Sequence, residues 1–237
     1  MDKLLEVNNI TFSIGTGGRR VLATGVLQEG GILNVCGPSG SGKTTLLRIL
    51  ARLRGPDEGQ VFLRGKGWHD FTPSRWRRTV HYLAQKPVIF DGTVLANLKR
   101  PFELAAVTSD LKFNPEKALE LMKRLLLPPE LINQDARTLS GGESSRLALV
   151  RTILVEPDVL LLDEPIAALD PRAASAVLRL IAEWPREVGG RGVVLVSHIG
   201  ELAKLPCLSV LDLEATEVLE PETKKDNPAG KEGDGVE

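Results

Sequence analysis

Cysteines, aromatic residues and long apolar runs are all scarce in this sequence. Only two cysteines, Cys36 and Cys207, occur among 237 residues, and neither has the spacing of a metal-binding or redox motif. A disulfide framework is therefore excluded, and both are interpreted as small apolar residues in a reducing compartment. No apolar run approaches the ~20 residues of a membrane helix, and no signal peptide is recognised. If the protein works at a membrane, we expect another chain to span it.

Charge of one sign is not in excess either. The 30 basic and 31 acidic side chains leave a formal net charge of −1, so the global balance favours neither nucleic acid nor a membrane surface as a partner. Hydrophobic residues make up 42% of the chain, which is enough for a sizeable core. A length of 237 residues fits one large domain or two small ones, and no internal repeat is present.

The most informative stretch is glycine-rich and matches the phosphate-loop pattern G-x-x-x-x-G-K-[ST]. Residues 32–36 predict a buried strand before it, and residues 45–53 predict a helix after it. Glycines let backbone N–H groups approach phosphate closely, and the helix adds the positive end of its dipole. Lys43 can reach the β- and γ-phosphates, and the Thr44 hydroxyl can ligate Mg²⁺. The predicted nucleotide-binding residues are Gly37, Pro38, Ser39, Gly40, Ser41, Gly42, Lys43, Thr44 and Thr45.

A second pair of glycines follows Ser140, where the pattern predicts the start of a helix. Ser140 and Glu143 have the spacing of a capping box, ahead of apolar residues at helical intervals. A capping box alone only begins a helix, but Gly141 and Gly142 are costly inside one and need another reason. Backbone N–H groups at a positive helix end, beside a hydroxyl, can bind an anion. The stretch therefore predicts a second phosphate site without a phosphate loop of its own.

Two carboxylates end the apolar run at residues 159–162, which predicts a parallel strand buried on both faces. Asp163 at the strand end is placed to hold Mg²⁺, and Glu164 can polarise an attacking water as general base. The alternative is a strand that merely ends in charged residues, which the preceding phosphate loop disfavours. Asp170 then caps a helix that has Pro171 at its first position.

Three further residues have both a functional and a structural interpretation. His198 ends a predicted strand at residues 193–197, where it is either a neutral core residue or a contact for the γ-phosphate at the ligand-binding edge of a parallel sheet. Gln85 follows a predicted strand at residues 80–84 and could orient water or touch a metal ion. Phe12 could stack on adenine or be an ordinary strand aromatic.

Segments in the first half of the chain predict further elements. Residues 4–27 predict strands joined by a turn, and the basic residues at 75–79 are interpreted as a solvated charged face. An apolar loop at residues 87–92 is a candidate docking surface. The short helix after it is predicted to be capped by Asp91 or Thr93.

The second half of the chain adds a helical insertion, a closing hairpin and a tail. The insertion is predicted at residues 100–129, and the helix that begins at Pro171 is predicted to end near residue 183. Residues 207–220 predict a hairpin. From residue 221 onward the chain is almost free of apolar residues, and we expect it to be disordered.

In sequence order, these motifs resemble those of the ATP-binding cassette (ABC) ATPases over nearly the whole chain. The most specific part is residues 139–143, because generic phosphate-loop proteins lack it. The resemblance implies an α/β P-loop NTPase with the ABC ATPase fold: a mostly parallel RecA-like core sheet, an amino-terminal antiparallel β-subdomain and an α-helical subdomain at about residues 93–155. The ABC ATPase domain is expected at residues 1–220, followed by a disordered tail at residues 221–237.

The resemblance also implies roles, with ATP and Mg²⁺ as cofactors. In the family, the stretch at residues 139–143 lies against the ATP held by the opposite subunit, and the glutamine after the strand senses the γ-phosphate. The implied catalytic residues are Glu164, His198 and Gln85; the implied metal ligands are Thr44, Gln85 and Asp163; and the implied nucleotide contacts outside the phosphate loop are Phe12, Ser140, Gly141, Gly142 and Asp170.

The implied partners are a second copy of the chain and a membrane protein. Two copies are expected to sandwich ATP, and a separate transmembrane permease is expected to dock near residues 87–98. This places the protein peripherally at the cytoplasmic face of the inner (cell) membrane, and no nucleic acid is expected. Ser144 and Ser145, with Ala167 and Ala168, depart from the residues usual in the family, and they leave the rate of hydrolysis open.

Within the family, residues 82–98 most resemble ATPase subunits of iron exporters of the FetA (YbbL) type. Importer subunits share parts of this loop, so an importer ATPase for another small solute is an alternative. A soluble ABC ATPase acting on nucleic acid or the ribosome is a second alternative, but its long coiled coil or second cassette is not found. A nucleotide-binding regulator without turnover is disfavoured by Glu164 and His198.

Overall fold

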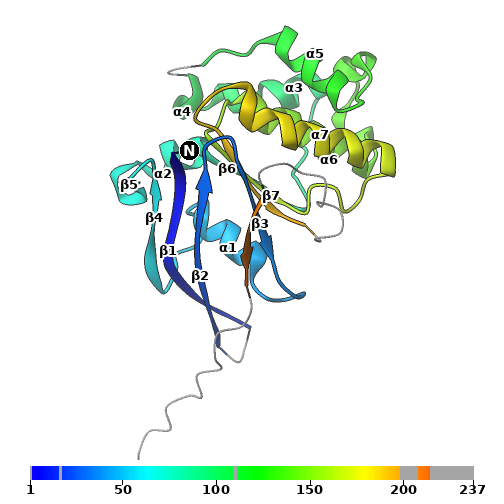
Figure 1. Cartoon of the computed structure of the whole chain (residues 1–237). Coiled ribbons are helices and arrows are strands. Elements are labelled where there is room, and N and C mark those ends of the chain that lie inside the picture. Colours follow the sequence, from blue (N-terminus) through cyan, green and yellow to red (C-terminus); the bar gives the residue numbers. More distant parts are fainter. Residues whose placement is uncertain (1, 16–17, 109–110, 198–207, 214–237) are drawn as a thin grey trace, which may run out of the picture.

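The computed structural model describes residues 2–15, 18–108, 111–197 and 208–213, which form two sheets with helices packed around them (Figure 1). His198, Cys207, the second half of the predicted hairpin and the predicted tail lie outside these residues. Cys36 is a buried strand residue, as predicted. Within the described ranges, no helix combines the length and apolarity needed to cross a membrane.

The amino-terminal sheet is antiparallel, with strand order β2-β1-β4-β5, and the predicted antiparallel subdomain is therefore confirmed. A bulge in β1 between Val7 and Ile10, where Asn9 has φ 49°, shifts the register and returns Ile10 and Phe12 to the buried face. The strands are β1 (Lys3–Ile14), β2 (Arg19–Gln28), β4 (Glu58–Leu63) and β5 (Lys66–Gly67).

The second sheet is parallel throughout, with strand order β6-β7-β8-β3-β9. Every residue of its three central strands is buried, as the uninterrupted apolar runs predict for strands covered on both faces. The strands are β3 (Ile32–Cys36), β6 (Val80–Leu83), β7 (Val159–Asp163), β8 (Gly192–Val196) and β9 (Leu208–Asp212).

The first strand of the predicted closing hairpin corresponds to β9, and its predicted partner at residues 216–220 lies outside the described residues. β9 pairs in parallel with β3 and so extends the central sheet at its edge. A five-residue apolar segment carries no local signal for the direction of its neighbour, because strand pairing is decided by the tertiary fold.

Helices flank both sheets and make up most of the region between β6 and β7. The α-helices are α1 (Lys43–Leu50), α2 (Pro73–Thr79), α3 (Val94–Lys99), α4 (Ala105–Thr108), α5 (Pro115–Arg124), α6 (Gly141–Leu154) and α7 (Pro171–Glu187). Short 3₁₀ turns are η1 (Trp68–Asp70), η2 (Arg100–Glu103), η3 (Pro129–Asn133) and η4 (Ala136–Thr138).

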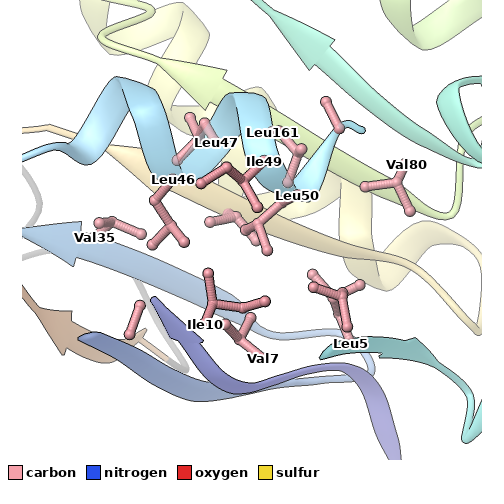
Figure 2. Close-up of a cluster of buried hydrophobic side chains, with 14 of the residues drawn as sticks. Leu5, Val7, Ile10, Val35, Leu46, Leu47, Ile49, Leu50, Val80 and Leu161 are labelled. Carbon is pink, nitrogen blue, oxygen red and sulfur yellow. The ribbon is translucent and has the colours of Figure 1, made fainter. Parts of the chain in front are cut away.

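Helix α1 is held between the two sheets, and this packing positions the loop that precedes it. Leu46, Ile49 and Leu50 of α1 belong to one hydrophobic cluster with Ile10 of β1 and Leu161 of β7 (Figure 2). All five side chains are at most 1% exposed. Burying a leucine or isoleucine contributes roughly 2 kcal/mol, so the position of α1 is strongly determined.

The basic residues at 75–79 lie on α2, where Arg75 and Arg77 are exposed, as predicted for a solvated charged face. Between them, Trp76 is fully buried and donates its indole N–H to the Leu50 carbonyl at 2.8 Å. The predicted end of the helix that begins at Pro171 needs correction. Helix α7 passes through Pro185 to Glu187. Trp184 and Pro185 are both buried, so packing of the last turn compensates for the hydrogen bond that proline cannot donate.

Candidate functional site

The phosphate loop joins the end of β3 to the start of α1, and its glycines have the unusual dihedral angles that the motif predicts. Gly37 has φ 139° and Gly42 has φ 100°, both in the region that favours glycine. A Cβ on Gly42 would lie 2.8 Å from the Phe12 ring, so a larger residue would collide with the core. Gly42 is also the N-cap of α1 and gives the first turn no side-chain hydrogen bond. The N–H groups of this turn can therefore serve an anion.

Lys43 folds back over the loop that carries it. Its Nζ donates to the carbonyls of Gly37 and Pro38 at 2.8 and 2.9 Å, so the ammonium is poised at the mouth of the loop. Arg19 of β2, which the motif search missed, donates to the Gly40 carbonyl at 3.1 Å and braces the loop from the antiparallel sheet. Of the other predicted loop residues, Ser39 is exposed, Ser41 is buried and Thr45 is half-buried in α1.

Asp163 at the end of β7 meets Thr44 at the start of α1. Asp163 is only 3% exposed, and the Thr44 hydroxyl donates to Asp163 Oδ1 at 3.1 Å. The Tyr82 hydroxyl donates to the other oxygen, Oδ2, at 2.9 Å. Burial and the neighbouring Asp163 carboxylate raise the pKa of Tyr82 to about 12, so this hydroxyl keeps its proton. Two of the three predicted metal ligands therefore lie in contact.

Glu164 and Gln85 lie side by side at the same edge of the sheet. Gln85 donates its amide Nε2–H to Glu164 Oε2 at 2.6 Å. The amide oxygen of Gln85 takes no part in this hydrogen bond. Glu164 has φ 48°, a strained conformation for a residue other than glycine and one that is often found at functional sites. Both residues line a cavity of about 220 Å³, to which α6 contributes Ser145 and Arg146. A carboxylate and an amide are thus held where they could orient one water molecule.

Phe12 contradicts the prediction that it stacks on adenine. Its side chain is 0% exposed, belongs to the hydrophobic core and lies beneath Gly42. A ring without accessible surface cannot stack on a base, so Phe12 is a core residue that supports the phosphate loop. Ile14, two residues further along β1, also lies near Gly42 and is only half-buried.

The second predicted anion site is the amino terminus of α6. The capping box is confirmed: Ser140 Oγ accepts from the Glu143 N–H at 3.3 Å, and Glu143 Oε2 accepts from the Ser140 N–H at 2.8 Å. The Ser140 hydroxyl also donates to Glu143 Oε2 at 2.7 Å, and this bond, with that from the Ser140 N–H, holds the pKa of the Glu143 carboxyl below its ordinary value. Gly141 is exposed, and a Cβ on it would meet nothing within 4 Å.

The segment between β7 and α7 supports this turn. A Cβ on Gly142 would lie 3.3 Å from Leu169 Cδ2, so the turn packs closely against the residue before Asp170. The Asp170 carboxylate caps α7 by accepting from the N–H groups of Arg172 and Ala173, each at 2.9 Å. Its predicted capping role is confirmed, and these bonds lower its pKa. Asp170 therefore shapes the segment that faces the second glycine pair.

Of the predicted catalytic residues, His198 lies outside the described residues. Sequence reasoning missed Tyr82 and Arg19. A tyrosine shortly before Gln85 was the available signal for Tyr82, but its contact with Asp163 depends on β6 lying beside β7. Arg19 sits in a turn-and-strand segment whose approach to the phosphate loop is likewise tertiary.

Comparison with known proteins places this site in a family. The family model described as ABC transporter matches residues 23–167. ABC transporter I family member 17 of Arabidopsis thaliana is 37% identical over 225 residues, which cover 92% of this chain and 82% of the relative. FetA of Escherichia coli (strain K12), described as a probable iron export ATP-binding protein, is 35% identical over 181 residues, with coverage of 76% and 73%. Import ATP-binding proteins for phosphonates and for methionine also match.

A solved structure agrees with the fold. The dimeric post-hydrolysis state of the ATP-binding cassette MJ0796, bound to ADP and Pi, has a TM-score of 0.74 at 26% identity and covers 92% of this chain and 99% of that one. The fold and the phosphate-loop site thus define an ATP-hydrolysing cassette. The chain belongs to the ABC transporter family, as an ATPase subunit.

Proposed function

We propose that two copies of this chain close around ATP and drive a separate membrane-spanning permease. The observation that carries the proposal is that one chain has two candidate anion sites, at the amino termini of two different helices. Lys43, Thr44 and Asp163 gather at the start of α1, whereas the glycine turn at the start of α6 directs the hydroxyl of Ser140 to Glu143. The exposed Gly141 leaves that turn open to a second molecule. The dimeric cassette MJ0796 supports this arrangement.

Each residue then has a defined task in hydrolysis. Lys43 exchanges its loop carbonyls for the β- and γ-phosphate oxygens and compensates their charge. Glu164, held by Gln85, accepts a proton from the attacking water, and Gln85 orients that water through its amide oxygen. Ser140 and Gly142 of the second copy present a hydroxyl and N–H groups to the γ-phosphate. His198 is proposed as a further γ-phosphate contact.

The residues at the phosphate loop fit Mg²⁺ as a cofactor. Thr44 and Asp163 offer a hydroxyl and a carboxylate oxygen, 3.1 Å apart, and hard oxygen donors are the ligands that this ion prefers. Gln85 would add an amide oxygen. When bound, Mg²⁺ would neutralise charge that builds up on the phosphate oxygens.

The proposed docking surface for the permease is the apolar loop that precedes α3, with that helix itself. Val88 is 63% exposed and Phe90 is 37% exposed. The fully buried Asn97 clamps this loop: its Nδ2 donates to the Phe90 carbonyl at 2.9 Å and its Oδ1 accepts from the Phe90 N–H at 2.8 Å. Arg151 adds a bond to the Val88 carbonyl at 2.7 Å. A loop that is rigid yet presents apolar side chains is suited to binding a partner.

A groove next to this loop extends the proposed surface. It has a volume of about 450 Å³ and is lined by α2, β6 and the segment after α3, including the exposed Leu104. Burial and the nearby Arg151 lower the pKa of His81 in this groove to about 4, so its imidazole is neutral at physiological pH. The groove suits a helical segment of a permease, and peripheral attachment at the cytoplasmic face of the cell membrane follows from such docking.

For the transported species we propose export of a metal ion, iron in the first instance. The FetA relative supports this choice, while the import relatives favour the second candidate, uptake of a small solute. Cells that lack the gene should accumulate iron when grown in excess iron, as measured by elemental analysis. Reduced uptake of a solute, with normal iron content, would instead establish the import function.

The dimer is tested with Glu164→Gln, which removes the basic carboxylate but keeps the size of the side chain. This variant should run as a dimer with ATP and as a monomer without it in light scattering, because ATP holds the copies together until it is hydrolysed. Adding Ser140→Arg should abolish the dimer while each chain still binds ATP. Adding Ser74→Arg, the same exchange on exposed α2, should leave the dimer intact. Equal dimerisation of both double variants would place the glycine turn outside the interface.

Docking is tested with Phe90→Glu. A buried carboxylate at an apolar contact is costly, so this variant should lose co-purification with its permease but bind ATP normally. Val188→Glu is the matched control, because Val188 is 52% exposed after the end of α7. Co-purification of Phe90→Glu at the control's yield would remove this loop from the docking surface.

A further inference from the structure

Tyr82 is joined to the metal-binding end of β7 by contacts that the proposed mechanism does not use. Its hydroxyl bonds Asp163 Oδ2 at 2.9 Å, while Thr44 bonds Oδ1 at 3.1 Å, so each carboxylate oxygen has a donor from a different element. The positive charge of Arg48 on α1 also acts on the Tyr82 hydroxyl. Tyr82, Asp163 and Thr44 form a hydrogen-bonded network that joins α1, β6 and β7.

Chemistry fixes the direction of both bonds in this network. A carboxylate can only accept, so the single hydroxyl proton of Tyr82 goes to Asp163. The Thr44 hydroxyl must likewise give its proton to Asp163, which turns its lone pairs away from the carboxylate. A hydroxyl oriented in this way can serve as a ligand.

Backbone pairing makes this contact rigid. Tyr82 stands opposite Leu161 in the parallel pairing of β6 with β7, two residues before Asp163. The hydroxyl therefore comes from a strand that is fixed to the strand of Asp163. The terminal torsion of an aspartate is soft, so without this donor the plane of the carboxylate is only weakly determined. Asp163 is 3% exposed, and water is a poor replacement for the missing donor.

We propose that Tyr82 is a positioning residue for Asp163. Its hydroxyl holds the plane of the Asp163 carboxylate so that Asp163 Oδ1 and the Thr44 hydroxyl face the bound nucleotide together. This inference rests on the proposed Mg²⁺ site. Partners that orient a metal ligand commonly change metal affinity by 10–100-fold when they are removed. Tyr82 acts through Asp163 and touches no reacting atom.

The central experiment is Tyr82→Phe, which keeps the ring and deletes only the hydroxyl. At saturating ATP, the Mg²⁺ concentration for half-maximal hydrolysis should rise by roughly 10-fold. ATP binding in the presence of EDTA should stay at the wild-type value, because the phosphate loop is untouched. The control is Ser175→Ala, which removes a hydroxyl that bonds the Pro171 carbonyl at 2.8 Å, away from this network. An unchanged Mg²⁺ dependence, with or without a lower Tm, would overturn the proposal.

A second readout does not depend on activity. Tyr82 is the only tyrosine of the chain, so its ring signals in a protein labelled with ¹³C-tyrosine need no assignment. In the slow variant Glu164→Gln with ATP and EDTA, addition of excess Mg²⁺ should shift these signals. Absence of any shift would show that Tyr82 does not sense the metal site.

Parallel variants separate this inference from the proposed site. If Asp163→Asn and Thr44→Val leave the Mg²⁺ dependence unchanged, the site itself is misplaced and the inference fails with it. If both alter it and Tyr82→Phe does not, only the positioning role fails.

Discussion

Glycine lies at the amino termini of α1 and α6, and both termini are candidates for binding phosphate, yet they are built differently. At the start of α1, Gly42 supplies no side-chain cap, and Lys43 adds a positive charge. At the start of α6, Ser140 and Glu143 satisfy each other's backbone donors. The first terminus therefore has N–H groups to offer by itself, whereas the second is already stable without a ligand.

This difference suggests separate roles for the two termini: that of α1 binds ATP, and that of α6 completes the site when the dimer closes. An uncapped terminus beside a lysine is suited to binding phosphate within one chain, because its N–H groups have no side-chain cap and the lysine adds positive charge. A capped terminus with an exposed glycine suits a surface that meets a preformed ligand, since it stays folded until that ligand arrives. The packing of Gly142 against Leu169 adds to this rigidity. ATP binding should thus depend on α1 and dimer closure on α6.

The largest effect is expected from Lys43→Ala. Removing the ammonium leaves the β- and γ-phosphate charge uncompensated, and ATP hydrolysis should fall by about 100-fold or more. The matched change is Lys117→Ala on α5, whose ammonium forms an ion pair with Glu156 far along the chain. Steady-state ATPase assays of both purified proteins provide the comparison. Hydrolysis by Lys43→Ala at the control's rate would contradict the assignment of the phosphate site to α1.

Adding one methyl group at the amino terminus of α1 or of α6 should change the free energy of unfolding in opposite directions. Gly42→Ala forces alanine into φ 100° with its Cβ 2.8 Å from the Phe12 ring, which should lower the free energy of unfolding by about 1–3 kcal/mol. Gly141→Ala meets nothing within 4 Å and should raise it by about 0.4–1 kcal/mol. Denaturant unfolding measures both. Similar losses in the two variants would show that the termini are less different than proposed.

The cap itself is tested with Ser140→Ala. Loss of the side-chain oxygen leaves the Glu143 N–H without its acceptor, which should cost about 1 kcal/mol of unfolding free energy. Thr93→Ala is the matched control, since Thr93 caps α3 by accepting from the Ala96 N–H at 3.1 Å. We expect losses of the same size in both. A much smaller loss in Ser140→Ala would mean that Glu143 sustains the turn alone.

The smallest effect is a pH dependence from Glu143. Its pKa is lowered in the folded state by the bonds from Ser140, so its contribution is present above the unfolded pKa and disappears as pH falls through the folded one. Glu143→Gln should therefore have a lower Tm than wild type at neutral pH, and the difference should shrink below about pH 4. Thermal melts across this range measure it. A difference that grows on acidification would mean that the carboxylate is not stabilised by this cap.

Local patterns predicted much of the fold and several residues of the candidate site. The strands β3, β7 and β8, the loop before α1, the capping box and Asp170 as a cap all follow from short-range chemistry: glycine for unusual dihedrals, side-chain oxygens for free N–H groups, apolar runs for strands buried on both faces. Thr93 rather than Asp91 caps α3, an alternative that the sequence left open.

Predictions failed where a residue's surroundings come from distant segments. Phe12 is an aromatic on a strand in either interpretation, and only the docking of α1 beneath the loop makes it a core residue. Pro185 would end an isolated helix, yet burial keeps it inside α7.

The sequence by itself determined the phosphate-binding chemistry, because a loop of contiguous residues carries its own glycines, lysine and hydroxyl. Only the tertiary structure brought the Tyr82 hydroxyl to Asp163 and Gln85 to Glu164, since these partners lie 81 and 79 residues apart in the chain. They meet because parallel strands end at one edge of the sheet, where side chains from separate segments converge. That order of strands is selected by burial of the whole core, which no short stretch encodes.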